Sequence, residues 1–161
     1  MEIRRAEKRD IPELLRLLVQ VDMVHHGIRP DLFNGPATKY TAEELEELLR
    51  DDARPVFVLP KGEGGALLGY CFCVLQEHAG DNVLTDIRTL YIDDLCVDEA
   101  ERGRGAGERL YRHAVGYARS LGCYNVTLNV WAGNDAAERF YRRMGMKPQK
   151  TGMEEILGSD A

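Results

Sequence analysis

Several features that would assign a chain to a class at once are missing from this sequence. Its four cysteines form no C-x-x-C pair, and its four histidines show no ligand spacing beyond one adjacent pair. We therefore expect buried reduced thiols, no disulfides and no metal site. No apolar run approaches the ~20 residues that span a bilayer, and the first residues hold no apolar signal core, so we expect a cytoplasmic protein without a membrane partner.

Linker-like composition and internal repeats are also missing, and 161 residues fit one domain, so we expect a single domain over residues 1–161. Charge is unevenly spread: residues 1–98 hold 11 basic and 19 acidic side chains, and residues 99–161 hold 10 basic and 8 acidic ones. This difference favours an anionic ligand for the second part and a cationic one for the first, although solvated surface charge also explains it. Because no basic stripe interleaves with aromatic residues, we expect no nucleic-acid partner.

A glycine-rich segment is the most informative feature that is present. It lies between an apolar strand-like run and an amphipathic helix-like run, and its sequence is Arg102-Gly103-Arg104-Gly105-Ala106-Gly107. Glycines have no Cβ, so backbone N–H groups can approach an anion closely, and the start of the following helix adds its positive dipole end. The segment therefore predicts a phosphate-binding loop, with a plain glycine turn as the alternative.

Two better-known phosphate loops fit this segment poorly. A Walker loop ends in Gly-Lys-Ser or Gly-Lys-Thr, whereas Gly107 is followed by Glu108 and Arg109. A dinucleotide-binding loop has the spacing G-x-G-x-x-G and an acidic residue about 20 positions later. Here the third glycine comes one residue early, and residues 125–130 are not acidic. The Walker class is excluded and the dinucleotide class is weakly supported.

Hydrophobic periodicity and turn residues predict a mixed order of helices and strands. Strands are expected over residues 2–5, 55–60, 66–77, 89–97 and 125–131, with a last one within 146–157. Helices are expected after a capping pair of Asp10 and Glu13, over residues 41–50 after a second capping box, and over residues 105–121 and 134–144, with a long loop over residues 25–40. Hairpins come first and a strand-helix-strand-helix unit follows, which indicates an α+β fold.

Two motifs together resemble the GCN5-related N-acetyltransferase (GNAT) superfamily. The pyrophosphate loop of that family, Q/R-x-x-G-x-G/A, matches residues 102–107, and its later motif N-x-x-A-x-x-F-Y matches Asn134, Ala137, Phe140 and Tyr141. The resemblance, best from about residue 89 to 146, implies a mixed, mostly antiparallel sheet of six to seven strands flanked by about four helices. In such a fold the sheet splays between the strand ending at Val97 and the strand ending at Trp131, and acetyl-CoA enters the gap.

The resemblance also implies how the co-substrate acetyl-CoA is held. Its pantetheine arm would bond to backbone groups of Leu95 and Val97, its pyrophosphate would lie on the N–H groups of the glycine-rich loop, and Asn134 would contact the arm. A helix N-cap role for Asn134 stays open beside this one. The implied donor-binding residues are Leu95, Cys96, Val97, Arg102, Gly103, Arg104, Gly105, Ala106, Gly107, Asn134 and Ala137. Since family members are often dimers, a homodimer is also open.

Acetyl transfer to an amine requires a proton acceptor, because an alkylamine with a pKa near ~10.4 is mostly protonated at neutral pH. An acidic residue occupies the position of Asp93 in polyamine acetyltransferases of the family, so we expect Asp93 to be the base, acting through water, with Asp94 as the second candidate. Strand alternation is expected to put Asp93 on the face of Leu95 and to put Asp94 on the opposite face. A purely structural role for one carboxylate stays open.

Tyr141 is the candidate acid for the departing thiolate. A phenol with a pKa near ~10 is protonated at neutral pH and can donate, although the same residue also suits a helix face packed on the sheet. A strand N–H around Leu95 or Cys96 would meet the oxyanion. Cys96 is a weaker candidate for a nucleophile, since no histidine lies near it in sequence.

These observations predict an acetyl-CoA-dependent N-acetyltransferase that acts on a primary amine in a ternary complex. The acceptor is a small molecule such as a polyamine or amino sugar, or an amino group of a protein or peptide. A non-catalytic acyl-CoA-binding sensor module is the alternative. Residues 25–40, with His25 and His26 at their start, and the region after residue 146 would shape the acceptor pocket, but they carry no motif.

Overall fold

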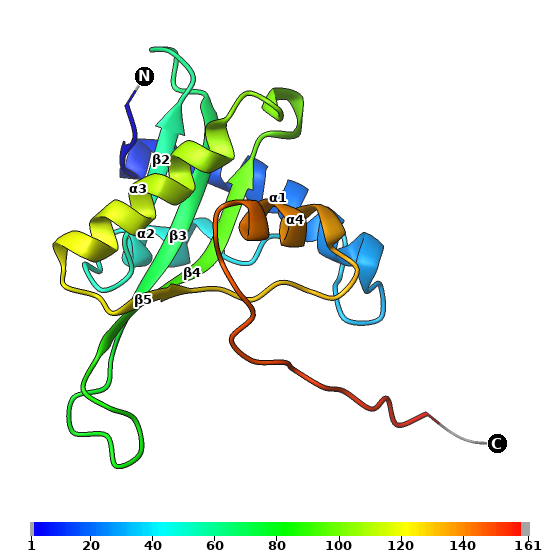
Figure 1. The fold of residues 1–161 in the computed structure, drawn as a ribbon. Coiled ribbons are helices and arrows are strands. Elements are labelled where there is room, and N and C mark those ends of the chain that lie inside the picture. The colour runs from blue at the N-terminus through cyan, green and yellow to red at the C-terminus, as the bar shows by residue number, and fades with distance from the viewer. Residues whose placement is uncertain (1, 159–161) are drawn as a thin grey trace.

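The computed structural model describes residues 2–158, which form one open sheet with helices on both faces (Figure 1). The five strands are hydrogen-bonded in chain order: β1 Arg4–Arg5, β2 Val56–Pro60, β3 Leu67–Glu77, β4 Arg88–Val97 and β5 Asn125–Thr127. The helices are α1 Ile11–Ile28, α2 Ala42–Leu48, α3 Ala106–Ser120 and α4 Asp135–Arg143, with short 3-10 turns at Lys8–Asp10 and Glu99–Glu101. The first four strands pair antiparallel, and β5 pairs parallel to β4.

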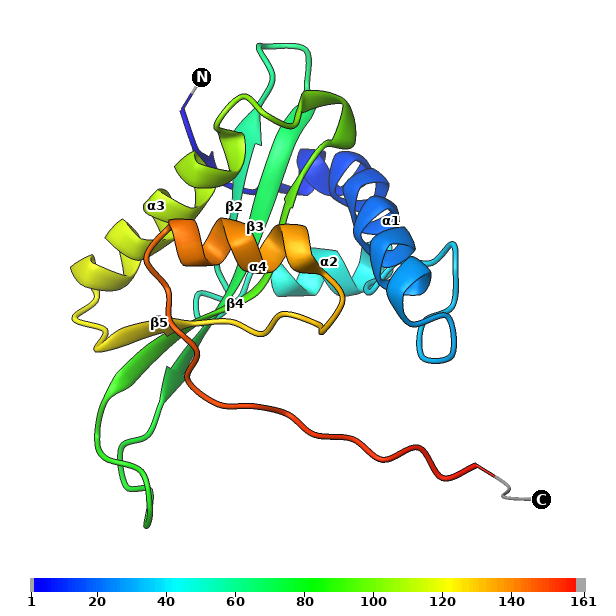
Figure 2. The same ribbon diagram turned by 45° about the vertical axis from the view of Figure 1, so that its right-hand side comes forward.

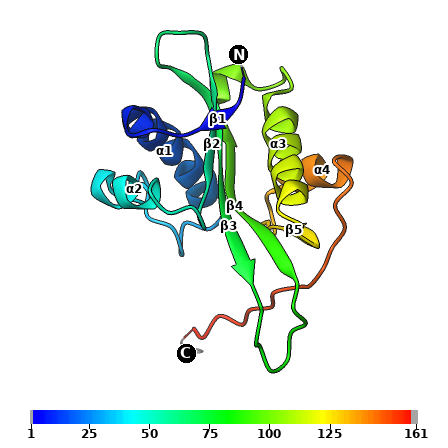
Figure 3. The ribbon, with the colours of Figure 1, turned by 90° about the vertical axis from the view of Figure 1, so that its left-hand side faces the viewer.

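Helices α1 and α2 cover one face of the sheet, and α3 and α4 cover the other (Figure 3). Strand β2 shows why both faces are covered, because all five of its residues are buried. Val56 and Val58 belong to the apolar cluster under α1 and α2, whereas Phe57 and Leu59 belong to the cluster under α3. Alternating side chains of one strand thus contribute to two cores, as the two-residue period of a strand requires.

The close approach of β3 and β4 depends on Gly69. A Cβ at this position would lie 2.4 Å from the carbonyl oxygen of Cys96 and 3.2 Å from the Cα of Val97. No larger residue fits there without moving the strand whose end holds the glycine-rich loop.

The α+β class is confirmed, but the described part of the chain contains five strands rather than six to seven. The strand expected over residues 125–131 ends at Thr127, because β4 offers β5 only three paired residues before the two strands separate. The last strand expected within residues 146–157 is missing from the described residues. Instead, the segment leaves the body (Figure 1), and Glu154 meets Arg29 at 2.7 Å.

Of the two capping pairs predicted at helix starts, one forms and the other does not. Thr41 and Glu44 form the expected capping box, with bonds of 3.1 and 3.0 Å to each other's backbone N–H groups. The pair of Asp10 and Glu13 does not cap α1, since Asp10 instead accepts from the Arg4 guanidinium at 2.7 Å. Helix α1 continues to Ile28, so the long loop starts about four residues later than expected and both loop histidines lie in the last helical turn.

Cys71, Cys73 and Cys96 are buried and Cys123 is half-buried, and all four are free thiols, as expected. Among residues 2–158, no helix combines the length and the apolarity that a bilayer crossing needs.

Candidate active site

The outer edge of β4 is open over its second half. Strand β4 pairs with β3 along its whole length, but β5 accompanies it only from Thr89 to Tyr91. Within the described chain, residues 92–97 therefore have a partner strand on one side only. This is the splayed edge that the resemblance implied, and it ends at the glycine-rich loop. Helix α4 crosses the sheet beside α3 and brings the second motif to the same region (Figure 2).

The glycine-rich loop has the backbone that a phosphate cradle needs. Gly103 and Gly105 have φ of 84° and 79°, in the left-handed region, and Gly105 is the N-cap of α3. A Cβ at either glycine would meet no atom within 4 Å beyond its chain neighbours, so the space above the loop is free for a ligand. A Cβ at Gly107 would lie 3.4 Å from Phe140, an ordinary van der Waals distance, so α4 packs beside the start of α3 at this position.

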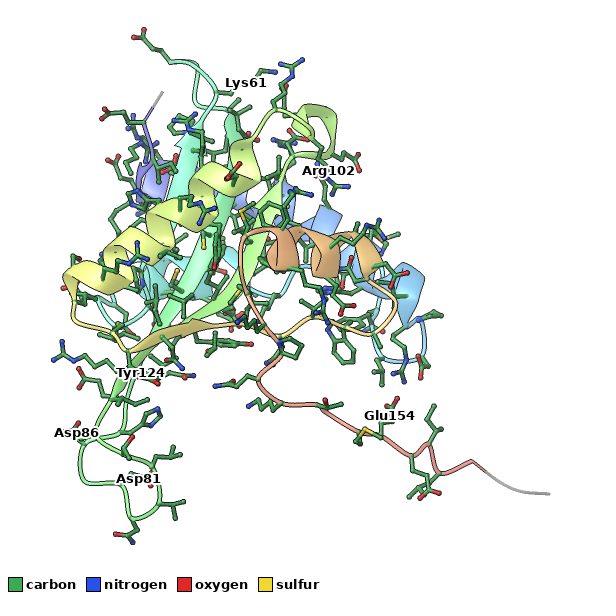
Figure 4. The ribbon with its side chains drawn as sticks, viewed as in Figure 1. Lys61, Asp81, Asp86, Arg102, Tyr124 and Glu154 are labelled. Atoms are coloured by element: carbon green, nitrogen blue, oxygen red, sulfur yellow. The ribbon has the colours of Figure 1, made fainter. Side chains whose placement is uncertain are left out.

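Two carboxylates hold the loop in place. Asp98 accepts from Arg16 at 2.9 Å and from Gln20 at 3.3 Å, which ties the end of β4 to α1. The buried Glu101 binds Lys61 from the β2–β3 turn and lies 3.2 Å from Arg104. The Arg104 guanidinium is therefore paired with Glu101. Arg102 is exposed at the same end of the molecule as Lys61 (Figure 4).

Strand alternation fails at Asp93 because β4 carries a bulge there. Phe72 of β3 faces Asp94, and Cys73 faces Ile92, so Asp93 is an extra residue without a counterpart. Ile92 consequently belongs to the cluster on the α3 side, whereas Cys96, an even number of residues later, belongs to the cluster on the α1 side. The expectation that Asp93 shares the face of Leu95 and Val97 is wrong.

Asp93 instead faces the segment between α1 and α2. Its carboxylate accepts from Lys39 Nζ at 2.7 and 2.8 Å and from the Tyr40 hydroxyl at 3.2 Å. The Tyr40 hydroxyl in turn accepts from Arg54 at 3.1 Å. These partners were missed by the sequence analysis, since they lie in a segment without a motif and only the bulge brings them to the carboxylate.

Asp94, the second of the two carboxylates, is half-buried. It accepts from the Tyr70 hydroxyl at 2.6 Å. Burial raises the pKa of Asp94 to about 6, and the nearby charge of Asp93 adds to the rise, while the Tyr70 hydrogen bond opposes it. Asp94 is therefore a carboxylate that titrates close to neutral pH, as a general base should.

Cys96 has the environment of an inert thiol. Burial raises its pKa to about 12, and the charge of Asp94 adds to this. The thiol is protonated at neutral pH, which disfavours a nucleophilic role, as expected from the sequence.

Tyr141 lies on α4, packed against the cluster on the α3 side. Its ring meets Phe140 at 5.1 Å and Tyr111 at 6.3 Å between centroids. Burial raises the pKa of Tyr141 above its usual range, and the charge of Asp94 contributes in the same direction. The phenol is therefore protonated at neutral pH.

The second motif builds the start of α4. Asn134 is the N-cap, and its side-chain oxygen accepts from the Ala137 N–H at 3.4 Å, so the capping role is confirmed. Nearby, the Phe33 ring lies 5.4 Å from Trp131 and 5.0 Å from His25, and His26 Nδ1 contacts the Phe33 carbonyl at 2.7 Å. The end of α1 and the segment before α4 thus meet beside the open edge. No cluster of metal-ligating side chains is found in the described residues.

Comparisons with known proteins agree with this geometry. The model of the acetyltransferase (GNAT) family matches residues 21–146. A mutant of protein BH1408 from Bacillus halodurans has a similar structure, with a TM-score of 0.91 and 30% identity over 98% of this chain and 99% of that one.

Curated relatives match over shorter stretches. Streptothricin acetyltransferase of Streptomyces lavendulae is 43% identical over 59% of this chain and 46% of that protein. Glucosamine 6-phosphate N-acetyltransferase 1 of Oryza sativa subsp. japonica is 50% identical over 26% of each. The matches thus span from about a quarter to less than half of the length of these relatives.

Proposed function

Because this chain belongs to the GNAT acetyltransferase family, we propose that it transfers the acetyl group of acetyl-CoA to a primary amine by direct attack in a ternary complex. The observation that carries the proposal is the open edge of β4, which leads into a left-handed glycine loop at the start of α3. Such an edge offers unpaired backbone groups to an amide-bearing arm, and the loop and helix start suit its diphosphate. One domain over residues 1–161 is part of the same proposal.

The donor is proposed to bind through main chain more than through charge. Leu95 to Val97 would bond to the pantetheine arm, and the N–H groups of residues 102–107 would meet the pyrophosphate. The exposed Arg102 guanidinium would add positive charge there. Arg104 would contribute less, because its charge is paired with that of Glu101. Asn134 and Ala137 would border the arm at the start of α4, and an N–H near Leu95 or Cys96 would receive the oxyanion.

Two carboxylates are proposed to remove the proton of the acceptor. Asp93, on the bulge, meets the ammonium and takes its proton through water. Asp94, the next residue, is the member of the pair whose titration limits the reaction, because its pKa of about 6 lies nearest to neutral. The neutral amine then attacks the thioester carbon, and the protonated Tyr141 donates to the departing sulfur.

We predict an acidic limb in the pH profile of kcat/KM, with a midpoint near 6. The raised pKa of Asp94 means that its carboxylate is protonated below about pH 6, so activity is lost as pH falls through that value. Four neighbouring groups do not titrate between pH 5 and 8: the pKa values of Lys39, Tyr70 and Tyr141 are raised by their surroundings, and that of Cys96 is about 12.

Steady-state kinetics of Asp94→Asn and Asp93→Asn test this assignment. Asp94→Asn is expected to remove the limb near pH 6, whereas Asp93→Asn lowers kcat/KM at every pH and moves the limb to lower pH, because the charge of Asp93 contributes to the raised pKa of Asp94. An unchanged limb in Asp94→Asn would show that another group titrates.

The test of the function is acetyl-CoA-dependent thiol release with a panel of amines, combined with mass spectrometry of the products. The panel contains linear alkylamines, amino sugars and a peptide with a free amino terminus, since the names of the relatives cover different acceptors. The alternative function, an acyl-CoA-binding sensor module, predicts acetyl-CoA binding without any acetylated amine.

We also propose a homodimer. Met153, Ile156 and Leu157 are 90%, 69% and 90% exposed and lie close together in sequence on the segment that leaves the body, and exposed apolar side chains that form a group suit a contact with a second copy. Sedimentation equilibrium is expected to give twice the mass of one chain, and Met153→Lys combined with Leu157→Lys is expected to give a single chain. A wild-type monomer at micromolar concentration contradicts this.

A further inference from the structure

One cationic side chain lies where the proposed function requires the ammonium of the acceptor. Lys39 belongs to the segment between α1 and α2, and its Nζ donates to both carboxylate oxygens of Asp93, at 2.8 and 2.7 Å. An alkylammonium on this carboxylate is the arrangement that an amine acceptor must adopt before Asp93 can take its proton. The side chain of Lys39 therefore has both the chemistry and the position of the reacting end of an acceptor.

The chain on both sides of Lys39 is anchored. The Ala37 N–H donates to Asp22 of α1 at 2.9 Å. The Tyr40 ring stacks on Phe72 of β3 at 5.8 Å between centroids, and its hydroxyl bonds to Asp93. These contacts fix the backbone close to the bulge, so the position of the ammonium follows from the fold of the segment.

The ion pair keeps Lys39 charged. Burial alone would lower the pKa of Lys39, but the hydrogen bonds and charge of Asp93 outweigh burial and hold it above its ordinary value. Lys39 therefore lies on Asp93 as an ammonium, the form in which an acceptor amine also arrives before it loses its proton.

Exposure shows which partner can leave. The side chain of Lys39 is 50% exposed and that of Asp93 is 16% exposed, so the lysine can move into water while the carboxylate stays in place. Half-exposed ion pairs are weak, so an incoming cation can replace Lys39. Tyr40 also lines a cavity of about 350 Å³ whose charged side chains are Glu44, Glu47, Asp51 and Arg54, so its net negative charge favours a cation in the surroundings.

We propose that Lys39 is an internal competitor for the ammonium position of the acceptor, and that the acceptor is an unbranched alkylammonium that displaces it. The inference rests on the proposed function, since it assigns the acceptor side of the same site. Lys39 reaches Asp93 through an unbranched methylene chain, and a linear amine has the same shape at its reacting end. An amino sugar, whose nitrogen lies on a ring carbon, does not.

The test compares Lys39→Met with wild type, using n-butylamine and 1,4-diaminobutane as probes. The methionine side chain keeps the length and removes the charge. We expect KM for both amines to fall about fivefold with kcat within about twofold, and the calorimetric Kd of the amines for the CoA complex to fall by the same factor. Lys39→Arg keeps a cation and is expected to behave as wild type. Lys8→Met is the matched control, because Lys8 is 77% exposed and pairs with Glu46 at 3.1 Å away from this site, and it is expected to change neither value.

The outcomes separate this inference from the proposed function. Turnover with an unchanged or raised KM in Lys39→Met overturns the inference, because a lysine that merely holds its segment in place would give that result, and leaves the function intact. If no variant turns over but the Kd of the amines is still lower in Lys39→Met, the proposed function is wrong. The proposal that Lys39 occupies the ammonium position is then still supported. No turnover and an unchanged Kd overturns both. Faster acetylation of glucosamine 6-phosphate than of n-butylamine contradicts the class of acceptor.

Discussion

Tyr141→Phe is expected to lower kcat by about 10²- to 10³-fold while the Kd of acetyl-CoA stays within about twofold of wild type. The substitution removes only the hydroxyl and keeps the ring, so the contacts with Phe140 and Tyr111 are preserved. What is lost is the proton donor for the departing thiolate. Burial already raises the pKa of Tyr141, so the hydroxyl is protonated over the whole working range of pH.

Tyr117→Phe is the matched control, because Tyr117 is an aromatic residue of α3 that packs on Phe57 at 5.1 Å. Thiol-release kinetics give kcat, and calorimetry gives the Kd of acetyl-CoA for each variant. If Tyr141→Phe keeps kcat within twofold of wild type, Tyr141 is a core residue and the assignment as acid is wrong. A defect confined to the Kd would assign it to donor binding instead.

Gly105→Val is expected to weaken acetyl-CoA binding by about 100-fold, equivalent to about 2.7 kcal/mol. At φ of 79°, a β-branched residue is strained, and relief of that strain turns the N–H groups of the loop away from the phosphate. A side chain at this position also points into the open space where the phosphate is proposed to lie. Calorimetric titration with acetyl-CoA measures the effect.

Gly116→Val provides the control for this substitution. Gly116 lies in the middle of α3, and a Cβ there would meet no atom within 4 Å beyond its own helix. Thermal unfolding of both variants shows whether they are folded, and Gly105→Ala, with a smaller side chain at the same φ, gives an intermediate loss if Gly105→Val does not fold. Folded Gly105 variants with wild-type affinity would exclude the loop from the donor site.

The features that the sequence predicted correctly depend on short-range physics. The left-handed glycines, the start of α3 at the loop and the N-cap at Asn134 each require only a few neighbouring residues. The family motifs record such local requirements, which explains why the donor side of the site could be proposed from the sequence.

The acceptor side could not be predicted because it is built from distant residues. One extra residue in β4 reverses the order of its faces, and no pattern in residues 88–97 marks the bulge at Asp93. Lys39 lies 54 positions before Asp93 in a segment without periodicity, and the bulge together with the packing of Tyr40 on Phe72 brings them together. The Asp94 environment, including the Tyr70 hydroxyl, likewise depends on pairing between β3 and β4.

Strand ends were the least predictable part of the fold. Residues 125–131 alternate well enough for a full strand, but β5 ends where β4 turns away from it, and this separation creates the open edge. The same geometry that made the strand prediction too long is therefore the basis of the proposed donor site.

Product analysis after incubation with acetyl-CoA and the amine panel tests the proposed acetyl transfer most directly. One N-acetylated amine is expected for each CoA thiol released, with the highest kcat/KM for linear alkylamines and a loss of about 10²-fold or more in Tyr141→Phe. Binding of acetyl-CoA without acetylation of any amine in the panel would contradict this expectation and would make the protein a binding module.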